Sequence, residues 1–299
     1  MRKTACLLVT LYLASCLWAQ SNSSRQISNE ERAYLELVNK PVVLTVPGMD
    51  SVIVRKDLTY KEAGNTSLKA DLYRPRNAGN QAPPLVIFIH GGVRPDLSVR
   101  PKDWGLFQSY GRLAAASGFS ALVFNHRGGF PKTLIPEATE DLADVITFAR
   151  KHATEWKINA DRICLAAFSG GGPLLNYAMR EHPDFVKCQI GMYPIVDIRR
   201  IAFIREQMTP EDLAKYSPVE QLQQNPSSPP LLLLRAGKDQ IPDLLAGLDP
   251  FIAMALARDA NITVMNNPGA PHGFDNREDT PRTREIIRAM LAFLHQHLD

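Results

Sequence analysis

The sequence predicts one large α/β domain built on a mostly parallel sheet. The first basis is a series of short, mostly apolar runs, which suit strands covered on both faces. These runs are "LVIFIH" (85–90), "ALVFNH" (121–126), "RICLAAF" (162–168), "CQIGMY" (188–193), "LLLLRAG" (231–237) and "ITVMNN" (262–267). The second basis is the helix-like segments between them, and the third is a length of 299 residues without a repeat or a Pro/Ser-rich linker. This alternation is typical of right-handed βαβ units.

The N-terminus has the pattern of a secretory signal peptide over residues 1–19. Two cations precede an apolar run of about fifteen residues, which is too short for a membrane span. Ala19 offers a small residue for cleavage, so simple export is the prediction. The alternative is "LASC" at 13–16, which resembles a bacterial lipobox and would remove residues 1–15 and leave Cys16 lipidated. We expect a periplasmic or extracellular protein, with anchoring through Cys16 as the variant.

The charge and composition of the chain are those of an ordinary globular protein. Apolar residues make up 45% and charged residues 22%. The formal net charge of +3 falls to +1 when residues 1–19 are removed, which argues against a nucleic-acid or anionic-membrane partner. We expect no membrane span in the mature chain, and the sequence does not indicate the oligomeric state.

The elements follow in order after an N-terminal extension over 20–49, which contains a short helix near 29–39. The domain is expected over 50–299. "SVIVRKDLTY" and "SLKADLYRP" flank the turn residues "GNT" and predict an antiparallel pair. Helices are expected at 104–117, 138–153, 171–181, 247–259 and 281–298. The proline-rich stretch 196–229 predicts a small helical insertion over one edge of the sheet or over the site.

Two cysteines, Cys164 and Cys188, lie outside the signal region and within apolar strand-like runs. We expect two buried thiols rather than a reactive site. An oxidising compartment would permit a bridge between them without requiring one, so that alternative stays open.

The stretch "RICLAAFSGGGPLL" at 162–175 places one serine between an apolar run and three glycines. Around Ser169, the second residue before (Ala167) and the second after (Gly171) are small, which is the spacing of a nucleophile elbow. A sharp strand-to-helix turn that exposes a serine brings the flanking backbones together, so both positions must be small. A glycine-rich phosphate loop or a plain βα turn is the alternative, and this motif alone does not decide.

A serine nucleophile needs a general base, and the base needs an orienting carboxylate. In this architecture the chain order is serine, acid, histidine. His182 follows Ser169 along a helix and so lies about 20 Å away, while His295 and His297 fall in the last turns of the terminal helix, where surface residues are expected. His272, in the loop "NNPGAPHGFD" after the last strand, is therefore the predicted base.

The predicted carboxylate is Asp239, which follows the strand "LLLLRAG". It lies 70 residues after the serine and 33 before the predicted base, in the required order. Asp197, after "GMYPIV", is the fallback, because the preceding strand can also supply this acid. Asp243 and Asp275 are expected to be loop caps or surface residues.

Acyl transfer also needs hydrogen-bond donors for the developing oxyanion. The backbone N–H of Gly170, the residue after the serine, is the first predicted donor. "IFIHGGV" supplies the second, and Gly92 is the best candidate, with Gly91 or Val93 as alternatives. His90 is expected to brace this loop rather than act as a base.

Six segments, "DLYRP", "IFIHGG", "NHRGGF", "AAFSGGGPLL", "RAGKDQ" and "PGAPHGF", occur in this order and spacing. The set resembles the α/β-hydrolase superfamily, in particular its dienelactone-hydrolase-like and acetyl-esterase-like members, over roughly residues 50–299. The resemblance implies an eight-stranded, mostly parallel sheet with helices on both faces and a triad of Ser169, Asp239 and His272.

Three departures from the superfamily pattern qualify the resemblance. Ala167 replaces the usual first glycine of the elbow. Dienelactone hydrolases proper carry cysteine at the nucleophile position, so Ser169 indicates esterase chemistry. The helical cap and the third glycine of the hormone-sensitive-lipase branch are missing, since residue 93 is valine.

The predicted function is therefore carboxylic ester hydrolysis by a carboxylesterase-type serine hydrolase, on small short-chain acyl esters or acyl esters of carbohydrates. No metal or cofactor is expected, because zinc-type spacings, a GK[ST] loop and a dinucleotide fingerprint are absent from the sequence. Two alternatives remain open. One is a serine aminopeptidase-like hydrolase, although the additional propeller domain of such enzymes has no room here, and the other is a non-catalytic binding member of the fold.

The substrate pocket is expected beside the predicted serine and oxyanion loop. Core packing is as good an explanation as substrate contact for its aromatic members. The candidate wall residues are Val93, Phe168, Tyr193 and Phe274. Three arginines, Arg94, Arg100 and Arg127, are expected to be solvated surface charges, with recognition of an acidic substrate group as the alternative.

Overall fold

The computed structural model describes residues 29–79, 81–92, 100–129 and 132–299. It divides into two compact units, residues 1–36 and residues 37–299. The second unit holds the whole sheet and is described below. The signal-peptide and lipobox predictions, like Val93 and Arg94, fall outside the described residues.

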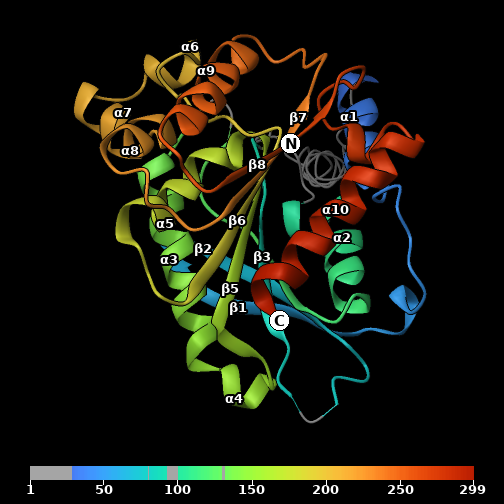
Figure 1. The fold of residues 1–299 in the computed structure, drawn as a ribbon. Coiled ribbons are helices and arrows are strands. Elements are labelled where there is room, and N and C mark those ends of the chain that lie inside the picture. The colour runs from blue at the N-terminus through green and yellow to red at the C-terminus, as the bar shows by residue number, and fades with distance from the viewer. Residues whose placement is uncertain (1–28, 80, 93–99, 130–131) are drawn as a thin grey trace, which may run out of the picture. The chain divides into compact units, whose positions relative to one another are not determined.

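Eight strands form one sheet, with the spatial order β1-β2-β4-β3-β5-β6-β7-β8 (Figure 1). Strands β3 to β8 pair in parallel, while β2 runs antiparallel to both of its neighbours, β1 and β4. The strands are β1 (Ile53–Ala63), β2 (Thr66–Arg74), β3 (Pro84–Ile89), β4 (Ser120–Phe124), β5 (Asn159–Phe168), β6 (Val186–Met192), β7 (Leu231–Ala236) and β8 (Ile262–Asn267). The predicted antiparallel pair and parallel sheet are both confirmed.

Helices cover both faces of the sheet, because parallel strands must be shielded on each side. Helices α2 and α10 pack on one face, and α3 and α5 lie on the other (Figure 1). The α-helices are α1 (Asn29–Asn39), α2 (Gly105–Ala116), α3 (Ile135–Lys151), α4 (Ala153–Trp156), α5 (Asn176–Glu181), α6 (Ala202–Arg205), α7 (Pro210–Tyr216), α8 (Pro218–Gln224), α9 (Leu244–Ala257) and α10 (Pro281–Leu298). The 3-10 helices are η1 (Met49–Ser51), η2 (Pro101–Asp103), η3 (Ser169–Leu175) and η4 (Phe274–Asn276).

Several boundaries differ from the sequence prediction; α3 and α9 each begin three residues earlier than expected, and two further differences bear on the site and the core. The helix expected over 171–181 begins as the 3-10 helix η3 and becomes α-helical only in α5, since Pro173 lacks an N–H and the glycines before it are poor helix formers. The compact unit also begins earlier than residue 50. Val42 and Leu44 are buried, and the Val42 N–H donates to Ser109 Oγ at 2.8 Å. Part of the expected extension therefore belongs to the core.

The two cysteines lie side by side in the middle of the sheet. Cys164 on β5 and Cys188 on β6 are register partners, and both are fully buried free thiols. Burial raises the pKa of Cys164 well above its usual value. The prediction of two buried, unreactive thiols agrees with this arrangement.

Candidate active site

Strand β5 ends at Phe168, and the chain turns sharply at the next residue. Ser169 has a φ of 52°, in the left-handed region that non-glycine residues rarely occupy. Such a backbone costs about 1–3 kcal/mol and persists only where its surroundings enforce it. A side-chain carbon on Gly171 would lie 2.5 Å from the His90 carbonyl oxygen, just past the end of β3. The turn is therefore possible because the second residue after the serine has no side chain.

Two loops bring an imidazole and a carboxylate to this serine. Asp239 follows β7 and His272 follows β8, so both lie at the same edge of the sheet as Ser169. His272 Nε2 is 2.8 Å from Ser169 Oγ, and its Nδ1 is 2.6 Å from Asp239 Oδ2. The Ile241 N–H donates to Asp239 Oδ1 at 2.9 Å, which fixes the carboxylate. Such a relay can remove a proton from the hydroxyl and stabilise the resulting imidazolium.

A second carboxylate holds the histidine loop from the other side, and the sequence analysis missed it. Asp275 is fully buried and accepts hydrogen bonds from the hydroxyls of Tyr193 at 2.7 Å and Tyr110 at 2.8 Å. The ring of Tyr193 packs edge-on against His272 with centroids 4.5 Å apart. Burial raises the pKa of Asp275, although the two tyrosine hydrogen bonds oppose the shift.

The surface-residue expectation for Asp275 is thus wrong. The only feature of the sequence that pointed to Asp275 is its position three residues after His272. Its tyrosine partners come from α2 and from the end of β6, and no local sequence pattern connects these elements to it. By contrast, Asp243 does lie exposed at the start of α9, as expected of a loop cap.

The predicted oxyanion donors lie next to each other. A side-chain carbon on Gly170 would be 3.0 Å from the Gly92 backbone nitrogen, and one on Gly91 would be 2.9 Å from Ser169 Cβ. The loop after β3 therefore packs directly against the nucleophile turn. The N-terminus of η3 leaves the first N–H groups without intrahelical partners, so the Gly170 amide is available to a ligand.

Behind this loop, His90 and His126 stack face to face, with centroids 3.7 Å apart and an interplanar angle of 2°. The His90 Nδ1 is 2.8 Å from the Gly91 carbonyl oxygen. Burial lowers the pKa of His90 well below its usual value, and it also lowers the pKa of His126. His90 is thus a neutral brace for the loop, as the sequence indicated.

A small cavity of about 60 Å³ opens beside the two glycines. Its described lining is mostly apolar and comes from the loops after β3 and β4, η3, α3 and α6 of the predicted insertion. The residues are Gly91, Gly92, His126, Arg127, Gly128, Gly129, Thr133, Ile135, Ala138, Gly170, Leu174, Ile195, Phe203 and Ile204. One part of the insertion therefore borders the site.

The aromatic residues expected in the pocket wall lie elsewhere. Phe168, Tyr193 and Phe274 are all buried and are not among the described residues of this cavity. Phe168 packs edge-on against Phe107 and Tyr110, with centroids 5.2 and 5.0 Å apart. The rings of all three pack in the core, and their contact with a substrate stays a prediction. Val93 lies outside the described residues.

The other candidates have structural partners. Asp197, the fallback acid, pairs with Arg199 at 3.0 Å and Arg200 at 3.3 Å. His182 contacts Asn225. His295 pairs with Asp299 at 2.8 Å, and His297 packs edge-on against Phe293. None of these side chains contacts Ser169 in the described structure.

A larger cavity of about 710 Å³ lies at the amino ends of the strands, where Arg74, Arg150 and Asn159 are among its lining residues. It is at the opposite edge of the sheet from Ser169, because Asn159 begins the strand that ends before the serine.

Among the described residues, no group of three or more His, Cys, Asp and Glu side chains could hold a metal ion. Within the same part of the chain, no helix is long and apolar enough to cross a membrane.

Comparison with known proteins identifies the family to which this chain belongs. The BD-FAE family model matches residues 70–257, well over half of the chain. The chain belongs to the BD-FAE family. Among curated proteins, none matches it. Its fold is that of the α/β-hydrolases.

Solved structures of the same fold include an esterase from Thermogutta terrifontis with propionate bound. It is 20% identical, with a TM-score of 0.66 over 84% of this chain and 96% of that one. The same esterase phosphoramylated by tabun gives a TM-score of 0.62 at 20% identity, over 83% and 96%. A thermostable esterase from Pseudomonas putida ECU1011 is 19% identical, with a TM-score of 0.67 over 90% of both chains.

The stacked imidazoles of His90, which is buried, and His126, which is half-buried, make the stability of this BD-FAE member depend on pH. The unfolded chain takes up protons on His90 and His126 near a pKa of about 6.5, whereas the folded chain resists doing so because both pKa values are lowered. Stability is thus fully present above pH 6.5 and falls as the pH drops toward the folded pKa values. Chemical denaturation between pH 7.5 and 5 should show this loss, at most about 1.4 kcal/mol per pH unit for each histidine.

The substitution His126→Gln should flatten that slope, because it removes one of the two groups. His182→Gln, at the surface, should keep the wild-type slope. If His126→Gln and wild type have the same slope, the neutral imidazole pair is not the source of the pH dependence.

Proposed function

We propose that this BD-FAE member is an exported serine carboxylesterase that hydrolyses short-chain esters through an acyl-enzyme. One observation carries the proposal. Ser169, His272 and Asp239 form a continuous hydrogen-bonded relay, with heavy-atom distances of 2.8 and 2.6 Å. Both distances are within the reach that a nucleophile, its base and the orienting carboxylate require.

In the first step, Ser169 Oγ attacks the ester carbonyl carbon while His272 Nε2 accepts the hydroxyl proton. Asp239, fully buried, keeps the proton on Nδ1 and stabilises the imidazolium. The N–H groups of Gly170 and Gly92 would then donate to the oxyanion of the tetrahedral intermediate. His272 returns its proton to the leaving alcohol as the C–O bond breaks, and the acyl group remains on the serine.

In the second step, His272 takes a proton from a water molecule, whose oxygen attacks the acyl-enzyme. The same two amides stabilise the second oxyanion, and the proton passes to Ser169 Oγ as the acid leaves. All atoms and protons are accounted for by the ester, one water and these side chains.

The small cavity supports a short acyl group. It lies beside both oxyanion glycines and has an apolar floor that includes Leu174 and Ile195. Its volume of about 60 Å³ is small, so we expect it to take a short acyl chain. The propionate in the Thermogutta esterase is consistent with this size class. Specificity for the alcohol part of the ester, whether alkyl or carbohydrate, depends on residues outside this cavity.

The triad proposal predicts covalent labelling of one serine. A fluorophosphonate probe should modify wild type, and Ser169→Ala or His272→Ala should abolish both labelling and hydrolysis of p-nitrophenyl acetate. Asp239→Asn should reduce kcat by about 10³-fold or more. Asp197→Asn is the matched control and should stay within about 2-fold, since its carboxylate contacts Arg199 and Arg200.

An unlabelled wild-type protein would exclude the triad and favour a binding role. Hydrolysis of aminoacyl p-nitroanilides in preference to p-nitrophenyl esters would instead favour the peptidase alternative.

The cavity predicts acyl-chain specificity. Values of kcat/KM should fall as the acyl chain lengthens from acetyl to octanoyl. Phe203 lines the cavity from α6 and is 37% exposed, so Phe203→Ala can enlarge it with little loss of core packing. We expect the hexanoate-to-acetate ratio of kcat/KM to rise about 10-fold. Ile53→Ala, at a similarly exposed position on β1, should not change the ratio, and an equal change in both variants would refute this assignment.

Export is supported by residues 1–19, whose charge and apolar run match a signal peptide. Expression of the full chain in a Gram-negative host, followed by fractionation and N-terminal sequencing, should give a periplasmic protein beginning at Gln20. Incorporation of labelled palmitate that is lost in Cys16→Ala would establish the lipoprotein instead. Recovery of unprocessed chain from the cytoplasm would contradict both forms of export.

A further inference from the structure

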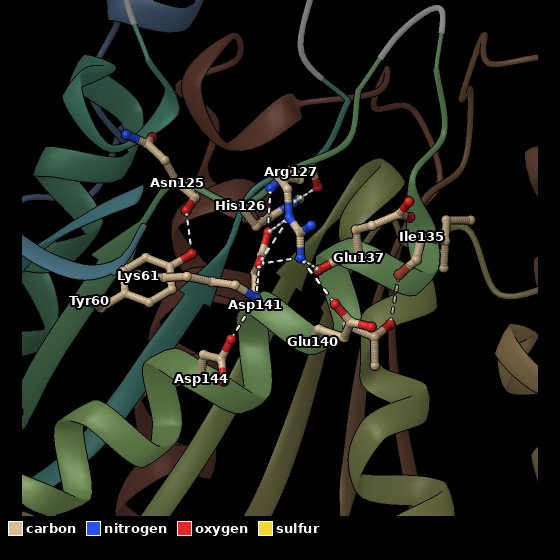
Figure 2. Close-up of polar contacts among 11 residues, drawn as sticks. Tyr60, Lys61, Asn125, His126, Arg127, Ile135, Glu137, Glu140, Asp141 and Asp144 are labelled. Atoms are coloured by element: carbon tan, nitrogen blue, oxygen red, sulfur yellow. Dashed lines mark hydrogen bonds and ion pairs between the residues drawn. The ribbon is translucent and has the colours of Figure 1, made fainter. Parts of the chain in front are cut away.

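A buried carboxylate with no part in the proposed reaction lies behind the oxyanion loop. Asp141 on α3 is fully buried, and two cations converge on it (Figure 2). The Arg127 guanidinium donates to both carboxylate oxygens at 2.8 to 3.1 Å, and Lys61 Nζ lies 2.8 Å from Oδ1. The Arg127 backbone N–H also donates to Oδ2 at 2.8 Å. We call Lys61, Arg127 and Asp141 the Asp141 cluster.

The cluster fixes the backbone of the loop after β4 as well as its side chains. Asp141 holds Arg127 through the main-chain and side-chain groups at once, which determines both the position and the direction of the chain there. Burial raises the pKa of Asp141, but the hydrogen bonds from Arg127 and Lys61 outweigh it and leave the pKa below its usual value. The carboxylate is therefore charged at neutral pH and binds both cations firmly.

Hydrogen bonds lead from this cluster to the imidazole pair. His126 Nδ1 is 2.8 Å from the Arg127 carbonyl oxygen, and the His126 backbone N–H donates to His90 Nε2 at 3.3 Å. Because Nε2 of neutral His90 then acts as the acceptor, its proton is on Nδ1. That Nδ1–H donates to the Gly91 carbonyl oxygen at 2.8 Å. One tautomer thus satisfies both contacts of His90.

Gly91 is in close contact with the turn at Ser169, so a movement of the loop after β3 would also move this turn. A side-chain carbon on Gly91 would lie 2.9 Å from Ser169 Cβ and 3.2 Å from the Gly170 nitrogen. The loop and the turn are therefore already in close contact, and a shift of a few tenths of an ångström changes where the amides of Gly92 and Gly170 point. Donors misplaced from the oxyanion lose most of their effect.

We propose that Asp141 is a positioning residue for the oxyanion hole. It acts through Arg127 and the stacked imidazoles to hold Gly91 and Gly92 against Gly170. This inference rests on the proposed function, because it assumes that Ser169 attacks a carbonyl group.

The test compares oxygen esters with thionoesters. Asp141→Asn keeps the shape of the side chain and an acceptor for the Arg127 N–H, but it removes the charge that binds the two cations. We expect kcat on p-nitrophenyl acetate to fall about 10- to 100-fold, with KM within about 3-fold. A thionoester places sulfur in the oxyanion hole and uses its donors poorly, so the oxygen-to-thionoester ratio of kcat/KM should fall by about the same factor.

Two further variants sharpen the result. Asp144 is half-exposed and contacts only Lys61 within the described network, at 2.6 Å. Asp144→Asn should therefore stay within about 2-fold of wild type and keep the wild-type ratio. Arg127→Lys retains the positive charge but loses the two-pronged contact, and it should lower the ratio in the same direction even if Asp141→Asn fails to fold.

The outcomes separate the two proposals. An equal loss of rate on both substrate types, or no loss in either variant, overturns the positioning role while leaving the esterase intact. A wild-type protein that neither hydrolyses esters nor reacts with a fluorophosphonate overturns the proposed function, and the positioning role falls with it. A fall in the oxygen-to-thionoester ratio of kcat/KM in both variants supports the positioning role of Asp141.

Discussion

The close approach of two strand ends is the constraint on which the site depends. β3 and β5 are adjacent and parallel, so the turns that follow them emerge together at one edge of the sheet. The contact is possible only because Gly171 offers no side chain to the His90 carbonyl oxygen, 2.5 Å from where its Cβ would be. The left-handed backbone of Ser169 is a consequence of this crowding. The Ser169 turn and the glycine loop after β3 are thus positioned by one packing contact.

The histidine loop is held between two buried carboxylates with different tasks. Asp239 contacts His272 directly, whereas Asp275 binds two tyrosine hydroxyls and so fixes the ring on which His272 rests. A loop rich in proline and glycine has few side chains of its own to pack. Anchoring from both sides compensates for that, and it explains why an acid three residues beyond the base is buried rather than at the surface.

The sequence allowed the mostly parallel sheet and the terminal helix to be predicted from their apolar patterns, and the three relay residues from motifs that directly follow strands. It did not reveal Asp275, whose tyrosine partners come from distant elements. It also did not reveal that Phe168 and Phe274 are buried, since an aromatic residue next to a site motif has the same local pattern whether its ring faces the core or the pocket. Arg127, expected as a solvated charge, is bound by Asp141, 14 residues away on α3.

Glycine-rich loops pose a general problem for a catalytic site, and the charged clusters here address it. Glycine permits the close approach that oxyanion donors need, but it has no side chain by which the loop can be anchored. The anchors must then come from flanking residues. The Asp141 cluster holds the β4 loop, and Lys102, buried among Asp57, Asp71 and Asp103, donates its backbone N–H to Asn125 at the end of β4. Among the described residues, the Asp141 cluster is linked to Gly91 through the uncharged imidazoles of His126 and His90.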